Sequence, residues 1–348
     1  GEKMGRQKSF ICIDLKSFYA SVECVERGLD PFKTNLVVAD PTRSQSTICL
    51  AITPAMKKLG VKNRCRIHEI PAGIEYITAM PRMQLYIDYS ARIYSIYLRY
   101  ISKEDIHVYS IDECFMDVTN YLSLYHMTEK EMAVELMDAV MKETGITATA
   151  GVGTNLYLAK VAMDIVAKHV EDHIGILNEI SYRQQLWDHR PLSDFWRIGS
   201  RTEKKLAGYG IHTMGDIAYT SVTSEEWLYK MFGIDAELLI DHAWGLESCD
   251  IHDIKNYHTE EHSLSNGQVL MRNYSFEEAA VVVREMTDVL VLDLVSKGLI
   301  TGSVTLWIAY DHRYERPSSH GTVRLTSLTN SSRSFGISLS GAIILHPG

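Results

Sequence analysis

The chain has 348 residues, of which 46% are hydrophobic, and a formal net charge of −9 at pH 7. This length suffices for two or more domains, each with its own core. Six cysteines without a C-x-x-C pair argue against a disulfide framework or a zinc site and favour a reducing compartment. No apolar run reaches membrane-spanning length, so we expect a cytoplasmic protein with no membrane partner. The negative charge weakens the expectation of a nucleic-acid partner without excluding it, since binding depends on where lysines and arginines cluster.

The first part of the chain predicts strands and helices in alternation. SFICIDL is a short apolar run with one acid, which is typical of a buried strand. Apolar residues then recur at helical spacing from Met83 to Ile101. The expected elements are a strand at 9–15, a polar helix from about Ser17 to Arg27, strands at 35–40 and 47–52, the helix at 83–101, and two strands, IHVYSI and CFMDVT, with SIDE at their turn.

The second part begins with a helix that Thr128 and Glu131 predict through a capping box. ITATAGVG (146–153) is the next strand, and a helix capped by Thr154 or Asn155 follows it. After Gly175 the chain becomes helical and basic. From about Tyr257 the expected elements are a strand, a long helix (Ser275–Lys297) and strands at 301–310 and 320–326.

This order predicts an α+β fold. Strand, helix, strand, strand, helix, strand is the split βαβ pattern of a ferredoxin-like domain, with residues 20–80 inserted after the first strand. The first strand then lies beside the central hairpin, so Asp14 approaches Asp112 and Glu113. Three carboxylates at one end of a sheet suit Mg²⁺ or Mn²⁺, and two such ions can clamp a phosphoryl displacement.

An alternative is that Asp112 and Glu113 are solvated turn residues. Asp14 argues against it, because four apolar residues precede this acid and a lone buried carboxylate is costly. Asp117 falls within the second strand of the hairpin, where we expect a local cap or pair and no metal.

Five motifs resemble those of the Y-family translesion DNA polymerases, and of the UmuC-like branch in particular. They are ICIDLKSFYASVE, TPAMKKLGV, YSIDECFMDVT, GVGTNLYLAKVAMDIVAK and DFWRIGSRTEKKLAGYGIHTMGDIA, and the resemblance covers about Phe10 to Ser332. It implies a catalytic ferredoxin-like palm at 1–19 and 81–177, inserted fingers at 20–80, a helical thumb at 178–250 and a second βαββαβ domain, the little finger, at 257–348. The apolar ending SFGISLSGAIILHPG departs from the family and predicts that this last domain is incomplete, through either truncation or an altered tail.

The resemblance also implies roles for single residues. Asp14, Asp112 and Glu113 match the metal-binding carboxylates, with the backbone carbonyl of Leu15 beside them. Tyr19 matches the steric gate, a ring that excludes a 2′-hydroxyl, and Phe18 lies beneath the nucleotide; an ordinary packed aromatic is the alternative for each.

Two lysines match positions that hold the triphosphate in the family. On spacing alone Lys160 shares a helix face with Asp164 and Lys168, which favours a solvated lysine, whereas the motif favours the triphosphate. The fingers motif departs from the family, since Pro54 replaces a tyrosine and Lys57 an arginine. Lysine offers a point charge where arginine offers a fork.

DNA binding is expected at the thumb and the little finger. Residues 195–218 resemble a helix-hairpin-helix, in which Gly199 allows a tight turn whose N–H groups bind a phosphate; an ordinary αα-turn is the alternative. Arg201, Lys204 and Lys205 add charge. Arg316 and Arg324 are candidate phosphate contacts of the little finger, with a solvated edge strand as the alternative.

The predicted function is template-directed, low-fidelity DNA synthesis past lesions in DNA damage tolerance and the SOS response. It uses two Mg²⁺ (or Mn²⁺) ions, primer–template DNA and dNTP, and the family adds a sliding clamp and a recombinase filament as partners. Two alternatives stand beside it. A DNA-binding accessory protein of the same fold would lack the chemistry, and a nucleotidyl cyclase would not need the basic helical segment or the last domain.

Overall fold

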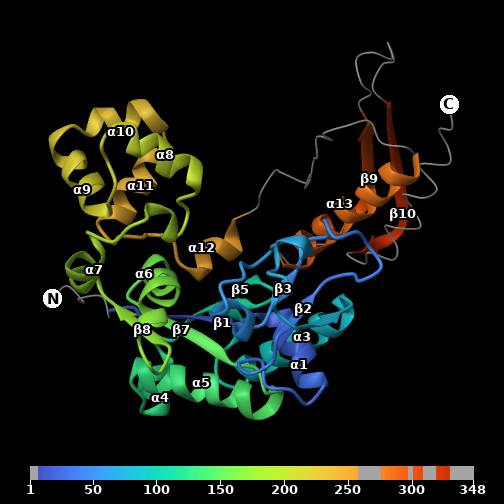
Figure 1. Ribbon diagram of the computed structural model, residues 1–348. Coiled ribbons are helices and arrows are strands. Elements are labelled where there is room, and N and C mark those ends of the chain that lie inside the picture. Colours follow the sequence, from blue (N-terminus) through green and yellow to red (C-terminus); the bar gives the residue numbers. More distant parts are fainter. Residues whose placement is uncertain (1–6, 258–275, 297–300, 309–318, 330–348) are drawn as a thin grey trace. The chain divides into compact units, whose positions relative to one another are not determined.

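The computed structural model describes residues 7–257, 276–296, 301–308 and 319–329 (Figure 1). By its contacts the chain forms two units. The larger comprises Gly1–His107 and Asp112–Tyr257, and the smaller comprises Val108–Ile111 and His258–Gly348. Each is taken by itself below.

A five-stranded sheet is the centre of the larger unit. Its order is β5-β6-β1-β7-β8, with β1 antiparallel to both neighbours and β7 parallel to β8. The strands are β1 (Phe10–Leu15), β5 (Ile106–Ser110), β6 (Glu113–Asp117), β7 (Ala148–Gly153) and β8 (Ile174–Leu177). The first four have the predicted ferredoxin-like order. β8 was not predicted, because its four residues include Gly175 and follow no alternating pattern.

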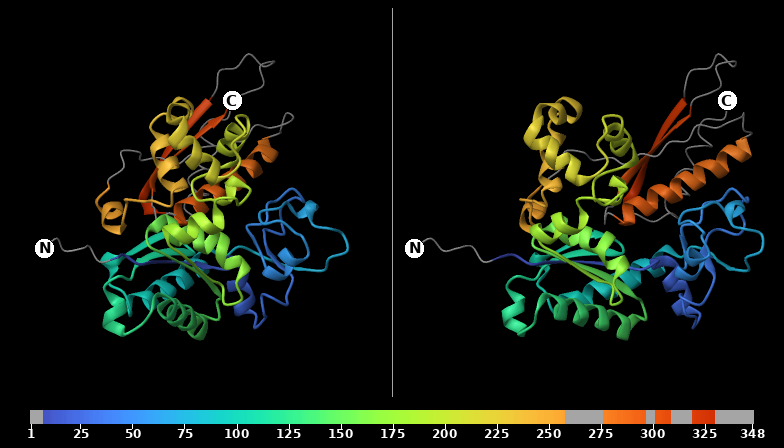
Figure 2. Two further views of the ribbon diagram at one scale, coloured as in Figure 1. Left: turned by 90° about the vertical axis from the view of Figure 1, so that its left-hand side faces the viewer. Right: turned by 60° about the vertical axis from the view of Figure 1, so that its left-hand side comes forward.

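Helices cover both faces of this sheet. α3 (Met83–Leu98) and α5 (Glu129–Thr144) pack together, and α5 lies on the face opposite α6 (Leu156–Val161) (Figure 1). Figure 2 shows the same layers from two further sides. A short helix, α4 (Tyr121–Tyr125), precedes α5. After α6 the chain continues as a π-helical turn, Ala162–Val166.

Two predicted helix starts are present in the structure. Thr128 and Glu131 form the reciprocal capping box at the start of α5. Asn155, and not Thr154, caps α6, since its side chain accepts a hydrogen bond from the backbone N–H of Leu158 at 2.8 Å. This fixes where α6 begins over the sheet.

Glycines let α6 approach β7 with no side chains between them. A Cβ atom at Gly151 would lie 2.0 Å from the backbone oxygen of Ala159, and one at Gly153 would lie 2.3 Å from the backbone nitrogen of Ala159. Strand backbone and helix backbone are therefore in direct contact beside Lys160. We refer to this contact as the glycine seam.

The inserted segment forms a small sheet of its own. Its order is β3-β2-β4, with β2 (Leu36–Val38), β3 (Ala51–Ile52) and β4 (Ile77–Ala79). The first two are shorter than predicted, and the third, parallel to β2, was not predicted. α2 (Pro54–Lys58) follows β3.

α1 (Phe18–Glu26) differs from the polar helix that the sequence suggested. Six of its nine residues are buried. They are Phe18, Ala20, Ser21, Val22, Glu23 and Cys24. Glu23 and Ser21 gave the helix its polar appearance, although the fold encloses both.

The segment after β8 is helical, as predicted. Its core includes Tyr157 and Leu158 of α6 together with Tyr182, Phe195 and Leu206. The helices are α7 (Glu179–Leu186), α8 (Ser200–Ala207), α9 (Met214–Thr223), α10 (Glu225–Phe232), α11 (Asp235–Ala243) and α12 (Ile251–Asn256).

Beyond Tyr257 the structure describes one helix and one strand pair. α13 spans Phe276–Ser296, and β9 (Thr301–Ile308) runs antiparallel to β10 (Ser319–Thr329). These agree with the predicted helix and strands. The strand expected near Tyr257 and the expected incomplete ending lie outside the described residues. Among the described helices, none is long and apolar enough to cross a membrane.

Candidate active site

The carboxylates predicted to meet do so through strand register. Asp14 of β1 and Glu113 of β6 are directly paired across the sheet. The backbone N–H of Leu15 donates to the carbonyl oxygen of Asp112 at 2.9 Å, which brings the start of the hairpin beside the end of β1. Residues at alternate positions of a strand share a face, so Asp14 lies on the same face as Phe10 and Cys12, which pack against α6.

Burial and mutual repulsion mark these acids as a charged cluster. Removal from water raises the pKa of Asp14 well above its usual value, and the neighbouring charges of Asp112 and Glu113 raise it further. Only 9% of Glu113 is exposed. Burial raises its pKa too, although the Lys160 ammonium opposes this shift.

Lys160 supplies the local countercharge. Its Nζ lies 2.7 Å from a carboxylate oxygen of Glu113 and 3.1 Å from one of Asp164. Burial alone would lower the pKa of Lys160, but Glu113 and Asp164 outweigh burial and raise it above its usual range. Cys12 adds a thiol hydrogen bond of 3.4 Å to Glu113. Lys160 thus offsets part of the negative charge on the face beside α6.

The aromatic pair follows the carboxylate through a tight turn. Ser17 adopts a left-handed conformation (φ 47°) and starts α1 immediately after β1. Phe18 is buried, with 4% exposed. The ring of Tyr19 stacks on that of Tyr86, with centroids 4.6 Å apart and planes at 23°. A residue distant in sequence therefore supports the predicted gate.

Pro54 and Lys57 occupy α2. Thr53 caps this helix by accepting from the backbone N–H of Met56, and Pro54 takes the first helical position, where a missing N–H costs nothing. Burial and the charge of Lys168 lower the pKa of Lys57, while Asp14 and Asp112 act in the opposite direction. Lys57 therefore lies in the electrostatic field of the carboxylates.

Lys16 is a further cation at this site that sequence reasoning missed. Burial lowers its pKa, Asp14 opposes that shift and Lys57 adds to it. Its Nζ is 3.3 Å from Nδ1 of His173. The signal was its position two residues after Asp14, where the end of a strand brings consecutive side chains to the same sheet edge.

The predicted DNA-binding residues of the helical segment lie on or next to α8. Gly199 is the N-cap of α8, and Arg201 and Lys204 are exposed. Lys205 is engaged within the segment, since its Nζ donates to the carbonyl oxygen of Met231 at 2.5 Å and lies 4.9 Å from the Phe232 ring centroid. Glu203 accepts from the backbone N–H of Ser193 at 2.6 Å. All four predicted residues are thus exposed, although Lys205 also has partners within the segment.

The remaining predicted residues belong to the smaller unit. Arg324 lies in β10 opposite Ser303. Arg316 lies outside the described residues.

Asp117 has the local role expected of it. Its Oδ1 accepts from the backbone N–H of Thr119 at 3.0 Å and from the Thr119 hydroxyl at 2.6 Å. This confirms that the acid acts as a cap at the end of β6.

Comparisons with known proteins agree with this geometry. Residues 13–164 match the family model described as the impB/mucB/samB family. A relative from Bacillus subtilis strain 168, named as a putative UV-damage repair protein UvrX, is 33% identical over 87% of this chain and 71% of its own length. Another from the same organism, named DNA polymerase IV 2, is 31% identical over 82% of this chain and 68% of its own length. The chain belongs to the Y-family DNA polymerases.

A solved structure supports the fold independently. A Y-family DNA polymerase chimera superposes with a TM-score of 0.62 at 20% identity, over 97% of this chain and 93% of that one. The predicted family and α+β fold class are confirmed.

Membership of this polymerase family implies dependence on a divalent metal ion, and the carboxylates fit one chemically. Asp14, Asp112 and Glu113 offer hard oxygen donors, and the charges of Asp112 and Glu113 raise the pKa of Asp14, an effect that a divalent cation would relieve. Within the described residues no three such side chains already stand in a metal-binding arrangement. Glu113 is paired with Lys160 through one carboxylate oxygen.

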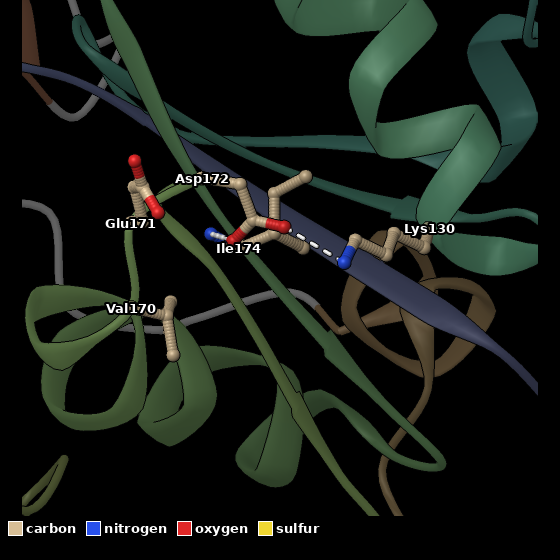
Figure 3. Close-up of a pocket in the computed structure, with 5 residues that line it drawn as sticks. All are labelled: Lys130, Val170, Glu171, Asp172 and Ile174. Atoms are coloured by element: carbon tan, nitrogen blue, oxygen red, sulfur yellow. Dashed lines mark hydrogen bonds and ion pairs between the residues drawn. The ribbon is translucent and has the colours of Figure 1, made fainter.

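A surface depression elsewhere on this polymerase is unrelated to the carboxylates. Its volume is about 430 Å³, and Figure 3 shows Lys130 paired with Asp172 at 2.8 Å across it. Its lining is Lys130, Val170, Glu171, Asp172 and Ile174. None of these residues belongs to the predicted site.

Proposed function

We propose that this chain catalyses template-directed, low-fidelity DNA synthesis past lesions, by attack of a primer 3′-hydroxyl on the α-phosphate of a dNTP with release of pyrophosphate. The observation that carries the proposal is the register pairing of Asp14 with Glu113 beside Asp112, in a chain of Y-family sequence. Phosphoryl transfer needs positioning and charge stabilisation more than a protein base, and the site supplies both.

The proposed metal site holds two Mg²⁺ ions, with Mn²⁺ as a substitute. Asp14, Asp112 and Glu113 would hold them together with the Leu15 carbonyl. When bound, such ions lower the pKa of the attacking hydroxyl and neutralise charge on the triphosphate. Lys160 pairs with Glu113 and so offsets the charge of one of the proposed metal-binding carboxylates.

The remaining site residues are proposed to bind substrate. Lys57 is assigned to the triphosphate, since it lies in the field of Asp14 and Asp112. Lys160, which pairs with Glu113 beside the proposed metal site, is assigned to it as well. Tyr19, held by its stacking partner, acts as the sugar gate, and Phe18 lies beneath the nucleotide.

DNA is proposed to bind at two places. Gly199, Arg201, Lys204 and Lys205 hold a phosphate at the helix-hairpin-helix, and Arg316 and Arg324 contact the backbone from the little finger. The palm, fingers, thumb and little finger keep the bounds predicted above. A sliding clamp and a recombinase filament are proposed as partners from the family alone.

A cytoplasmic location is proposed from the cysteines. All six thiols are free, and five are buried. Free thiols in such number fit a reducing compartment.

The test is primer extension with Mg²⁺ or Mn²⁺. We expect wild type to add nucleotides and Asp112→Ala to lose at least about 100-fold in rate, the scale expected when a group stabilising transition-state charge is removed. Asp117→Ala is the matched control, because this acid of the same hairpin caps Thr119; it should keep activity. No extension by wild type at high enzyme, together with retained DNA binding, would favour an accessory protein without chemistry.

A further inference from the structure

Glu23 is a fully buried carboxylate outside the metal site. It lies on α1, and none of it is exposed. Arg82 donates to it from Nε at 2.9 Å and from a terminal nitrogen at 2.5 Å. Arg27 adds an ion pair, and the hydroxyl of Tyr86 donates to it at 2.8 Å. Burying an ion is expensive, so a carboxylate satisfied this fully points to a requirement for fixed geometry.

Tyr86 connects Glu23 to Tyr19, the predicted steric gate. Tyr86 is also fully buried, and its ring carries the stacked ring of Tyr19. The hydroxyl at the far end of the Tyr86 ring is held by Glu23. Tyr86 is therefore fixed at one end by a charge-assisted hydrogen bond and supports Tyr19 with its face.

Helix geometry explains why these groups meet. Tyr19 and Glu23 are four residues apart on α1, and Arg82 and Tyr86 are four apart at the start of α3. Side chains at this spacing are neighbours on one helix face. Two facing pairs thus form the α1–α3 joint, which we define as Tyr19, Glu23, Arg82 and Tyr86.

We propose that Glu23 and Arg82 are positioning residues for sugar discrimination, acting through Tyr86 on the ring of Tyr19. The proposal rests on the function proposed above, in which Tyr19 excludes a 2′-hydroxyl. A gate excludes one oxygen atom only if its ring cannot retreat, and Tyr86 occupies the space into which the Tyr19 ring would retreat. Glu23 and Arg82 in turn keep Tyr86 in place.

The experiment compares selectivity for dNTP over rNTP, as the ratio of kcat/KM values on one primer–template. Tyr86→Phe removes the hydroxyl that binds Glu23 and keeps the ring. Arg82→Met removes the bidentate partner. We expect the ratio to fall roughly threefold in the first and about tenfold in the second, with most of the change in incorporation of rNTP, because small displacements at a reacting site have large effects. Arg82→Lys, which keeps the charge without the fork, should fall between wild type and Arg82→Met.

Tyr89→Phe is the matched control. The Tyr89 hydroxyl donates to Glu26 at 2.6 Å, so this variant removes a similar tyrosine–glutamate hydrogen bond between the same two helices, away from Tyr19. It should leave the ratio within about twofold of wild type, even if it lowers the melting temperature as much as Tyr86→Phe. A purely structural role of Glu23 would lower both kcat/KM values together and leave the ratio unchanged.

Tyr19→Ala distinguishes the gate role of Tyr19 from the positioning role of Glu23 and Arg82. If it abolishes selectivity while Tyr86→Phe and Arg82→Met retain the wild-type ratio, the gate stands and the positioning role is wrong. If Tyr19→Ala keeps the ratio, both the gate and the positioning role are wrong, whereas the polymerase activity tested by Asp112→Ala is unaffected.

Discussion

Lys160 shows how a single residue offsets charge within a cluster of buried carboxylates. Three carboxylates meet where β1 and the hairpin end, and burial makes their mutual repulsion costly. Lys160 bonds to Glu113 and Asp164 and so removes part of that cost.

At the scale of a single residue, Lys160→Met tests the countercharge role of this lysine. Removing one partner of a buried pair leaves an uncompensated charge, so in chelator we expect a loss of about 3 kcal/mol in the free energy of unfolding. Added Mg²⁺ should restore more stability to the variant than it gives to wild type. Denaturant unfolding with and without Mg²⁺ measures both quantities.

Lys130→Met provides the comparison for Lys160→Met. Its partner is Asp172, and their side chains are 55% and 41% exposed. Exposed pairs contribute about 0–1 kcal/mol, so this variant should show little loss and no added response to Mg²⁺. Equal effects in the two variants would contradict the countercharge role of Lys160.

At the scale of elements, the glycine seam determines where α6 lies. Gly151 and Gly153 allow the backbone of the helix to rest on β7, and Gly175 of β8 allows the same approach to the π-helical turn, with a Cβ there 2.1 Å from the oxygen of Ala162. Lys160 follows Ala159 directly in the sequence. The position of Lys160 relative to Asp14 therefore depends on this contact between the helix and strand backbones.

Gly153→Ala tests the seam. The new Cβ would lie 2.3 Å from a backbone nitrogen, which cannot move aside as the end of a side chain can. We expect a loss of about 3 kcal/mol in unfolding free energy, at the upper end of overpacking effects. Gly73→Ala, where a Cβ meets nothing within 4 Å, should be nearly neutral. A neutral Gly153→Ala would show that α6 moves freely over β7.

The elements that the sequence predicted are those with local signals. The capping box at Thr128, the apolar run of β1 and the turn at Asp112 are all readable within a few residues. From these the ferredoxin-like order and the meeting of Asp14 with Glu113 followed. β8 and β4 have no such signal, because they are short and depend on a partner strand from elsewhere in the chain.

The contacts of the α1–α3 joint also have no local signal in the sequence. Glu23 reads as a surface residue in a helix, and Arg82, its partner, is 59 residues away. No spacing rule links residues so far apart. Topology brought Asp14 to the hairpin because sheet order is limited to few choices, but the packing of one helix against another is fixed only by the complete set of side chains.

At the scale of the whole molecule, a negative net charge disfavours binding to DNA only when charge is averaged over the whole chain. The chain carries −9 overall, whereas the exposed groups on α8 include Arg201 and Lys204. Glu203, the acid between them, faces the backbone of Ser193. Binding to a phosphate backbone depends on such local sets, since counterion release occurs where cations meet phosphates.

Salt dependence tests this assignment. A lysine that contacts a phosphate contributes about 1 to the slope of log affinity against log salt concentration. Lys204→Gln should therefore reduce the slope for primer–template DNA by about that amount. Lys142→Gln, on α5 at the opposite face of the sheet from α6, should leave it unchanged. Fluorescence anisotropy at several salt concentrations measures both, and equal slopes in wild type and Lys204→Gln would remove the lysine from the DNA contact.

The glycine seam also has a consequence for engineering this polymerase. Because α6 meets β7 through main-chain atoms, random mutagenesis there samples failures to fold more often than new activities. The α1–α3 joint is instead built of side chains, and the side chain of Arg82 is about half exposed. Libraries aimed at accepting sugar-modified nucleotides should therefore vary Arg82 and Tyr86 and keep Gly151 and Gly153 constant.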